Sequence, residues 1–418
     1  NMLLSKRPEM FLPDKWPAYY KKAKGCHVVD LDNKKYLDMS LMGVGTCILG
    51  YSNSEVDKAV IASIKNGNMS TLNCEEEYLL SKKILSFNKW ADMVRFARTG
   101  GEANAIAVRI ARAANPEKRQ NIAICGYHGW HDWYLSANLK NKKNLDQHLL
   151  SGLSTSGVPN NLIGTVYPFM FNNIDQLTKI IKKNNIGIVK MEIYRNVPPD
   201  KKFIEAIKFL KKKYNFTLIF DECTSGFRET FGGIHQKYNI TPDICVYGKA
   251  MGNGYAITAV VGKKHIMNSA QNSFISSTFW TERAGPSAAL KTLEIMEKLK
   301  SWKIISKKGE SFKRRLNKLG IKYNLPIKIF GNNGIPSFSF NSKNNMKYKT
   351  LITQEMLKSN ILASNVIYIS VMHDLKKFNK YFNCLDLIFE KIADCESGYQ
   401  VDKLLEGPIC HATFQRLN

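Results

Sequence analysis

Residues 203–222 read FIEAIKFLKKKYNFTLIFDE and contain the pattern that decides the fold. The first part of this stretch repeats apolar side chains at helical spacing, and the second part is a short apolar run with strand character that ends in Asp221 and Glu222. Between about Val60 and Gly262, similar apolar runs occur at 122–125, 188–191 and 259–261. Strand-like runs that alternate with amphipathic helical stretches predict an α/β fold with a mostly parallel sheet covered by helices.

The rest of the chain predicts a second, smaller domain. Residues 28–31 and 35–38 alternate around a turn, as the two strands of a hairpin do. After a long helical pattern from about 285 to 300, the chain continues with further helices and short strands such as 336–340. We therefore expect a large mostly parallel-sheet domain at 59–298, a small α+β domain at 299–418, and an N-terminal segment at 1–58 that contributes to the small domain.

Length and composition indicate a globular protein. The 418 residues, 44% of them hydrophobic, are enough for two separate cores. No apolar run approaches the roughly 18 residues that a membrane span needs, and the N-terminus has no signal-peptide pattern. The nine cysteines form no C-x-x-C pair and are interpreted as free thiols in a reducing compartment. We expect a cytoplasmic protein that does not associate with membranes.

The net charge of +26 comes from 61 Lys and Arg residues against 35 Asp and Glu residues. Such an excess raises the hypothesis of a non-catalytic basic protein that binds a polyanion. Much of it, however, is Lys in short clusters such as 182–185 and 211–213, and no basic run alternates with aromatic residues as a base-stacking surface does. We favour a composition bias of the whole chain and expect no nucleic-acid partner.

A glycine pair precedes one of the predicted helices. Residues 98–102 read Arg-Thr-Gly-Gly-Glu and lead into an apolar-periodic stretch at 105–114. Glycines at a helix start leave backbone N–H groups bare, and the helix dipole adds positive character there. The turn therefore suits a phosphate group, although an ordinary N-cap with an acidic first turn explains the same residues.

Aromatic and histidine residues follow the predicted strand at 122–125. Residues 126–132 read Gly-Tyr-His-Gly-Trp-His-Asp. An aromatic side chain at a strand end can lie flat on a planar ring. A metal site is the alternative because His128, His131 and Asp132 are close in sequence, but no further ligand segment of suitable spacing occurs. We predict no metal.

Two charged residues stand at the ends of predicted strands. Asp221 ends the strand at 217–220, and the carboxyl ends of parallel strands are where such sheets bind ligands. A structural or Walker-B-like acid is the alternative, but the chain contains no G-x-x-x-x-G-K-[ST] loop. Lys249 ends another apolar segment and stands between glycines, where an amine could form an imine. The alternative for Lys249 is one more surface lysine.

Taken together, in this order and spacing, these segments resemble the class III pyridoxal-phosphate-dependent aminotransferases, and most closely their glutamate-1-semialdehyde 2,1-aminomutase branch. The resemblance runs from about Gly25 to Thr278 and beyond. Its most specific markers are Asp221-Glu222 followed by Gly-Phe-Arg at 226–228, and then Gly248-Lys249. It implies fold type I of the pyridoxal-phosphate-dependent transferases, like that of aspartate aminotransferase, and pyridoxal 5′-phosphate as the cofactor.

The resemblance also implies catalytic roles. Asp221 would keep the ring nitrogen of the cofactor protonated, so that the ring acts as an electron sink. Lys249 would hold the cofactor as a Schiff base and later move a proton as a general acid/base. Tyr127 would stack on the pyridine ring, and His128 would bind the cofactor beside it.

The remaining cofactor contacts follow from the same resemblance. Gly100 and Gly101 would bind the phosphate through backbone N–H groups. Glu192 matches a family glutamate near the phenolic side of the cofactor. Thr278 matches a threonine that reaches the phosphate from the neighbouring subunit, which implies a homodimer with shared active sites.

Two reactions are compatible with the resemblance. The first is transfer of an amino group from a small-molecule donor to a carbonyl acceptor, with pyridoxamine 5′-phosphate as the intermediate. The second is the aminomutase reaction, in which nitrogen moves between adjacent carbons of one substrate. Residues 278–283, Thr-Phe-Trp-Thr-Glu-Arg, depart from the family's small Gly-Asn-Pro turn, whereas residues 42–45 resemble the pocket segment of the aminomutase. The sequence leaves both reactions open and does not identify a substrate.

Overall fold

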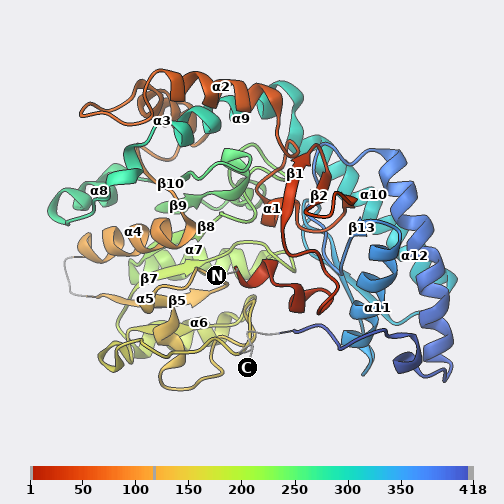
Figure 1. The fold of residues 1–418 in the computed structure, drawn as a ribbon. Helices are drawn as coiled ribbons and strands as arrows, with labels where there is room; N and C mark the ends of the chain where they lie inside the picture. The colour runs from red at the N-terminus through yellow and green to blue at the C-terminus, as the bar shows by residue number, and fades with distance from the viewer. Residues whose placement is uncertain (1–2, 116–118, 413–418) are drawn as a thin grey trace. The chain divides into compact units, whose positions relative to one another are not determined.

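A computed structural model describes residues 3–115 and 119–412 (Figure 1). The chain divides into two compact units. Within the described residues, one unit is Val56–Glu294, and the other combines residues 3–55 with residues 295–412. The domain boundaries that the sequence suggested, after residues 58 and 298, stay a prediction. Among the described residues, no helix is both long enough and apolar enough to cross a lipid bilayer.

The unit Val56–Glu294 contains a seven-stranded sheet with the strand order β4-β10-β9-β8-β7-β5-β6. In that order the strands are Met93–Ala97, Thr258–Gly262, Ile244–Tyr247, Thr217–Asp221, Ile186–Met191, Asn121–Cys125 and Val166–Pro168. Strand β10 runs antiparallel to both of its neighbours, and the pairs from β9 to β6 are parallel. The mostly parallel sheet predicted from the alternating apolar runs is confirmed.

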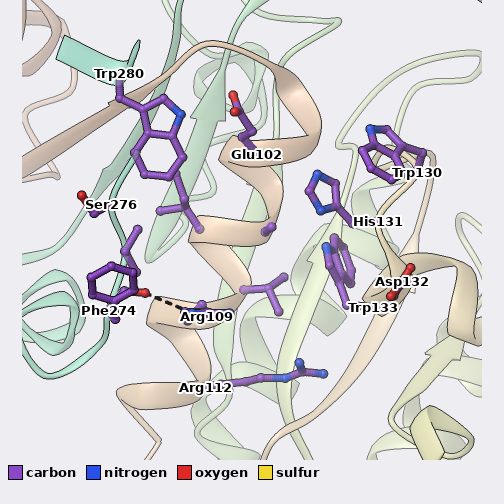
Figure 2. A pocket seen from close by; sticks show the side chains of 14 residues that line it. Glu102, Arg109, Arg112, Trp130, His131, Asp132, Trp133, Phe274, Ser276 and Trp280 are labelled. Atoms are coloured by element: carbon purple, nitrogen blue, oxygen red, sulfur yellow. Dashed lines mark hydrogen bonds between the residues drawn. The ribbon is translucent and has the colours of Figure 1, made fainter. Parts of the chain in front are cut away.

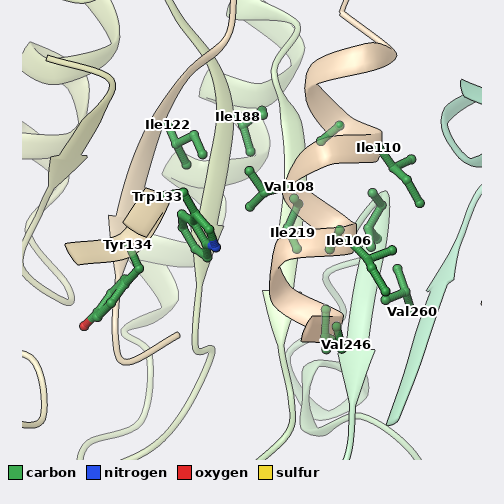
Figure 3. Close-up of a cluster of buried hydrophobic side chains, with 14 of the residues drawn as sticks. Ile106, Val108, Ile110, Ile122, Trp133, Tyr134, Ile188, Ile219, Val246 and Val260 are labelled. Carbon is green, nitrogen blue, oxygen red and sulfur yellow. The ribbon is translucent and has the colours of Figure 1, made fainter. Parts of the chain in front are cut away.

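Eight α-helices lie wholly or partly within this unit of the described chain. They are α2 (Ser54–Lys65), α3 (Glu75–Phe87), α4 (Gly100–Ala113), α5 (Asp132–Leu135), α6 (Ile174–Lys183), α7 (Lys201–Tyr214), α8 (Lys264–Met267) and α9 (Ala284–Leu299). Helix α4 contacts strands β7 to β10, whereas α6 contacts β5, β7 and α7. Figure 3 shows Ile106 and Val108 of α4 in one buried cluster with Ile188, Ile219 and Val260 of the sheet. Burial of this apolar face fixes the start of α4 beside the sheet.

The other unit combines short sheets with three long helices. Its strands are β1 (Tyr20–Lys24), β2 (His27–Asp30), β3 (Lys35–Asp38), β11 (Ile327–Phe330), β12 (Ser337–Phe340) and β13 (Ile361–Leu362), and its helices are α1 (Met42–Gly45), α10 (Ser301–Lys322), α11 (Asn345–Lys358) and α12 (Leu375–Glu396). The predicted hairpin is present, with β2 antiparallel to β3. Strand β2 ends at Asp30 rather than at Leu31 because the Asp30 carboxylate accepts the backbone N–H of Lys34 and closes the turn.

Candidate active site

Four loops meet at one edge of the seven-stranded sheet. Strands β5, β7, β8 and β9 are parallel, so the loops that follow them leave from the same edge. Strand β4 is antiparallel to β10, which is antiparallel to β9, so the turn between β4 and α4 also lies at this edge. The sequence-predicted residues of unit Val56–Glu294, apart from Thr278, stand in these loops or at their ends.

Asp221 is the last residue of β8, and its side chain is only 3% exposed. Its Oδ2 lies 2.9 Å from Nδ1 of His128, and its Oδ1 accepts the backbone N–H of Cys223 at 3.1 Å. Burial alone would raise the pKa of the Asp221 carboxyl, but the hydrogen bond from His128 and the positive charge of Lys190 outweigh burial and hold that pKa well below its usual value. Asp221 is therefore ionised at neutral pH.

The fully buried His128 is the donor in this pair. Burial, with the charge of Lys190 as the next cause, lowers the pKa of its imidazole. A neutral imidazole beside an ionised carboxylate must carry its hydrogen on Nδ1, because only that tautomer donates to Asp221. His128 thus fixes the orientation of the Asp221 carboxylate.

The glycine turn predicted to bind phosphate opens helix α4. Thr99 and Glu102 form a capping box, in which the Glu102 carboxylate accepts the Thr99 N–H at 2.8 Å and Thr99 Oγ1 accepts the Glu102 N–H at 3.4 Å. The ordinary N-cap is therefore present. Its two hydrogen bonds use the N–H groups of Thr99 and Glu102 and do not involve the N–H groups of Gly100 and Gly101. A Cβ on Gly101 would lie 2.9 Å from the His131 ring, so a side chain at this position requires that ring to move.

Lys249 follows β9 and lies close to the segment after Asp221. Its Nζ donates to Oγ1 of Thr224 at 2.6 Å. Its backbone is in the left-handed region, with φ +39°, which side-chain-bearing residues seldom adopt and which often marks functional sites. A Cβ on Gly100 would lie 3.7 Å from Sγ of Cys223. The two residues Cys223 and Thr224 therefore connect the glycine turn, Asp221 and Lys249.

Glu192 follows β7, is nearly buried, and links two other loops. Its Oε2 accepts the backbone N–H of Tyr127 and a guanidinium N–H of Arg195, each at 3.0 Å. Arg195 also donates to Oγ1 of Thr224 at 3.4 Å. The Tyr127 ring is partly buried, and burial raises the pKa of its phenol. Glu192 thus holds the loop that carries Tyr127 near the Lys249 loop.

Thr278 is not joined to these residues within the chain. It begins a short 3-10 turn, Thr278–Thr281, and its side chain is exposed. Its carbonyl accepts the hydroxyl of Thr281. In the described part of the chain, no hydrogen bond connects Thr278 with another predicted site residue.

Thr224 and Arg195 were not predicted as site residues. Each follows a strand that was predicted, and each lies three residues beyond a strand-end carboxylate, Asp221 or Glu192. This position at the carboxyl edge of a parallel sheet is the signal that could have identified them.

Three side chains of the types that bind metal ions lie close together, at a different place from the segment 128–132 that the sequence suggested. Glu222, His235 and Cys245 are buried and close enough together to hold an ion. The Glu222 carboxylate already accepts N–H groups of His235 and Ile234 and the hydroxyl of Ser225. Those hydrogen bonds account for the buried acid without a metal.

A cavity of about 650 Å³ lies along α4, between Glu102 and Arg112. Figure 2 shows Arg109 and Arg112 of α4, with His131 and Trp133 to one side and Phe274 and Trp280 to the other.

Large aromatic side chains lie exposed around this cavity and Thr278. Trp130 is 70% exposed, Phe274 is 86% exposed and Phe279 is 70% exposed. Large apolar side chains exposed to this degree are typical of a surface that another molecule covers.

Comparisons with known proteins identify related chains. The family model "Aminotransferase class-III" matches residues 13–374. A 3-aminobutyryl-CoA aminotransferase of Cloacimonas acidaminovorans (strain Evry) is 34% identical over 369 residues, which cover 85% of this chain and 84% of the relative. A glutamate-1-semialdehyde 2,1-aminomutase of Nitrosopumilus maritimus (strain SCM1) is 30% identical over 405 residues, covering 90% and 93%. The FumI protein of Sphingopyxis sp. MTA144, solved in its pyridoxal-phosphate internal aldimine form, shares the fold with a TM-score of 0.85, at 21% identity and with coverage of 97% and 96%.

Proposed function

Because the chain belongs to the class-III aminotransferases, which depend on pyridoxal phosphate, we propose that Lys249 and Asp221 carry the chemistry of amino transfer in it. The observation that carries the proposal is that both side chains form hydrogen bonds with consecutive residues of one loop. The Asp221 carboxylate accepts the backbone N–H of Cys223, and the amine of Lys249 donates to the hydroxyl of Thr224. A buried carboxylate and a lysine amine held by one loop suit a cofactor that is bound at both places.

The residues present fit pyridoxal phosphate. A side chain at Gly101 would press on the His131 ring, and backbone N–H groups at the start of α4 suit a phosphate dianion. The ionised Asp221 suits a protonated ring nitrogen, and Lys249 supplies the amine that holds the cofactor covalently. When bound, the cofactor supplies a carbonyl that accepts amino groups and a ring that stabilises charge on the substrate carbon.

The protein contributes positioning and proton transfer. Lys249 would move a proton to and from the substrate carbon while its amine is released from the cofactor, and the Thr224 hydroxyl would hold that free amine. Asp221, oriented by His128, would keep the proton on the ring nitrogen. Glu192 holds the loop of Tyr127, whose aromatic ring would stack on the cofactor.

The reaction we propose is transfer of an amino group between two molecules. The relative with 34% identity is named an aminotransferase, which favours this reaction. The aminomutase reaction is the second candidate, favoured by the relative with 30% identity that covers 90% of this chain. The two reactions differ in whether turnover consumes a separate amino donor.

Nitrogen labelling separates the two candidates. We expect the purified protein with pyridoxal phosphate to move ¹⁵N from a labelled donor, tested as a panel that includes glutamate, into a carbonyl acceptor, as followed by mass spectrometry. The same protein given glutamate-1-semialdehyde alone is expected to form no isomer. Donor-independent isomerisation of that compound would instead establish the aminomutase reaction.

We also propose a homodimer in which Thr278 of each subunit binds the cofactor phosphate of the other. Three observations support it: Thr278 is exposed, no hydrogen bond among the described residues joins it to its own predicted site residues, and the ring of the next residue, Phe279, is 70% exposed. A second copy of this chain that covers this ring would bring its Lys249 site towards Thr278.

Subunit mixing tests this arrangement. Thr278→Ala is expected to weaken cofactor binding about tenfold or more, because it removes a hydrogen bond to a charged group. At a cofactor concentration that leaves Thr278→Ala homodimers largely unloaded, Lys249→Ala and Thr278→Ala subunits, unfolded and refolded together, should regain activity, because one site of each mixed dimer is complete. A mixture of Lys249→Ala with Asp221→Asn is the control and should stay inactive, since both residues belong to one subunit's site. A Thr278→Ala mixture that also stays inactive would refute donation across the interface.

A further inference from the structure

Lys190 is a fully buried lysine near the end of strand β7, and the chemistry proposed above does not use it. Its side chain is 0% exposed. Its Nζ donates to Oδ1 of Asn104, in helix α4, at 2.6 Å. Lysine is almost never fully buried unless its charge is compensated, and an amide oxygen brings no charge. The charge that compensates Lys190 must therefore come from another group.

The sheet places Lys190 on the same face as Asp221. In the register of the sheet, Lys190 pairs with Ile124 of β5 on one side and with Ile219 of β8 on the other. Figure 3 shows Ile188 and Ile219 within the apolar cluster against α4. Side chains two residues apart on a strand point to the same face, so Lys190 and Asp221 both project towards that layer from neighbouring strands.

Four titratable groups oppose the effect of burial on the Lys190 amine, and Asp221 is the one that can balance its positive charge. These groups are Asp221, Glu192 and the thiols of Cys223 and Cys245. Burial raises the pKa of both thiols well above the usual value, so the thiols are neutral. Glu192 already forms an ion pair with Arg195 at 3.0 Å.

The effects on Lys190 and Asp221 are reciprocal. Burial lowers the pKa of the Lys190 amine, and the charge of Asp221 is the strongest effect that opposes this shift. Among the effects that lower the pKa of Asp221, the hydrogen bond from His128 comes first and the charge of Lys190 comes next, ahead of any charge on His128. Lys190 is therefore the cation that balances the carboxylate in this buried layer.

We propose that Lys190 is a positioning residue of the active site, which keeps Asp221 ionised so that the proton between Asp221 and the cofactor's ring nitrogen stays on the nitrogen. A nearby positive charge lowers the proton affinity of a carboxylate. Without that charge, the buried carboxyl takes the proton more readily and the ring loses its electron-withdrawing form. This inference rests on the proposed role of Asp221.

The test is the ¹⁵N NMR signal of the ring nitrogen in holoenzyme loaded with ¹⁵N-labelled pyridoxal phosphate. In the wild type we expect the signal of a protonated ring. Lys190→Met keeps the length of the side chain and removes its charge. Removing one partner of a buried ion pair destabilises a fold, so the signal of this variant is read on protein that is shown to be folded and loaded with cofactor. We expect this variant to shift the signal towards that of an unprotonated pyridine.

A second variant and two controls make the result decisive. Asn104→Asp keeps Lys190 but places a carboxylate beside its amine, which offsets the positive charge that acts on Asp221. This variant should therefore shift the signal in the same direction, whether or not Lys190→Met folds. Lys308→Met is the matched control: Lys308 is a half-buried lysine in the other unit whose Nζ also donates to a neutral oxygen, that of Val371, and its variant should leave the signal unchanged. Asp221→Asn tests the underlying assignment and should itself remove the protonated signal.

The outcomes separate the two ideas. If Asp221→Asn removes the protonated signal but folded, loaded Lys190→Met or Asn104→Asp keeps the wild-type signal, the inference about Lys190 is overturned and the role of Asp221 stands. A wild-type ring that is already unprotonated refutes the role of Asp221 and, with it, the inference about Lys190.

Discussion

Replacing Lys249 by alanine is expected to lower kcat for amino transfer roughly 10³-fold, the scale on which a positioned general acid/base contributes. The amine of Lys249 is the group that the Thr224 hydroxyl holds beside the Asp221 loop. Without it, no side chain of this loop can hold the cofactor covalently or move the substrate proton. The rate is measured under saturating donor, acceptor and cofactor, so that weaker cofactor binding does not imitate a slower reaction.

A matched control exists in the same sheet. Lys263 also follows a strand and a glycine, Gly262, but its Nζ forms an ion pair with Asp243 at 2.9 Å instead of joining the site. Lys263→Ala is expected to keep kcat within a few-fold of the wild type. Mass spectrometry after borohydride reduction should find the cofactor attached at residue 249 in both the wild type and Lys263→Ala. Cofactor attached elsewhere, or Lys249→Ala with near-normal kcat, would refute the assignment of Lys249.

Asp221→Asn is expected to lower kcat by roughly 10²- to 10³-fold, the range for losing one preorganised electrostatic contact to the reacting system. Asparagine keeps the shape of the side chain but cannot carry the negative charge that holds a proton on the ring nitrogen. Because the pKa of the Asp221 carboxyl is held far below its usual value, wild-type kcat should show no titration of this group near neutral pH. The measurement is kcat against pH for the wild type and the variant.

Asp243→Asn is the control for this prediction. Asp243 is also a buried aspartate, but it binds Lys211, Lys263 and the backbone N–H of Leu218, on a part of the sheet that the reaction does not use. Its loss should reduce the free energy of unfolding, because it leaves buried donors unpaired, while kcat stays near the wild-type value. An Asp221→Asn variant that behaves in the same way would mean that Asp221 is only structural.

The sheet, and the strand ends at which the predicted site residues stand, could be predicted because local patterns specify them. An apolar run that ends in a charged residue indicates a buried strand and its carboxyl end, as at Asp221. The glycine pair at 100–101 is likewise a local signal for the start of a helix. In each case the sequence neighbours that identify the residue are also its structural neighbours.

The residues that sequence reasoning missed depend on contacts between loops. Thr224 is significant because the side chain of Lys249, from another loop, reaches it, and Arg195 because it joins Glu192 to that hydroxyl. No spacing along the chain encodes such a contact. Lys190 did leave a signal: a charged residue within the otherwise apolar run 188–191 conflicts with a strand that is buried on both faces. Such conflicts between local rules are expected at functional sites.

The left-handed backbone at Lys249 shows that this position is not optimised for folding alone. A side chain at positive φ costs roughly 1 kcal/mol relative to glycine, the residue that adopts this conformation without strain. Selection for stability alone would therefore favour glycine at position 249. A lysine there gives up part of a small folding margin for the amine that we propose holds the cofactor, and engineering that ranks substitutions only by stability would favour its removal.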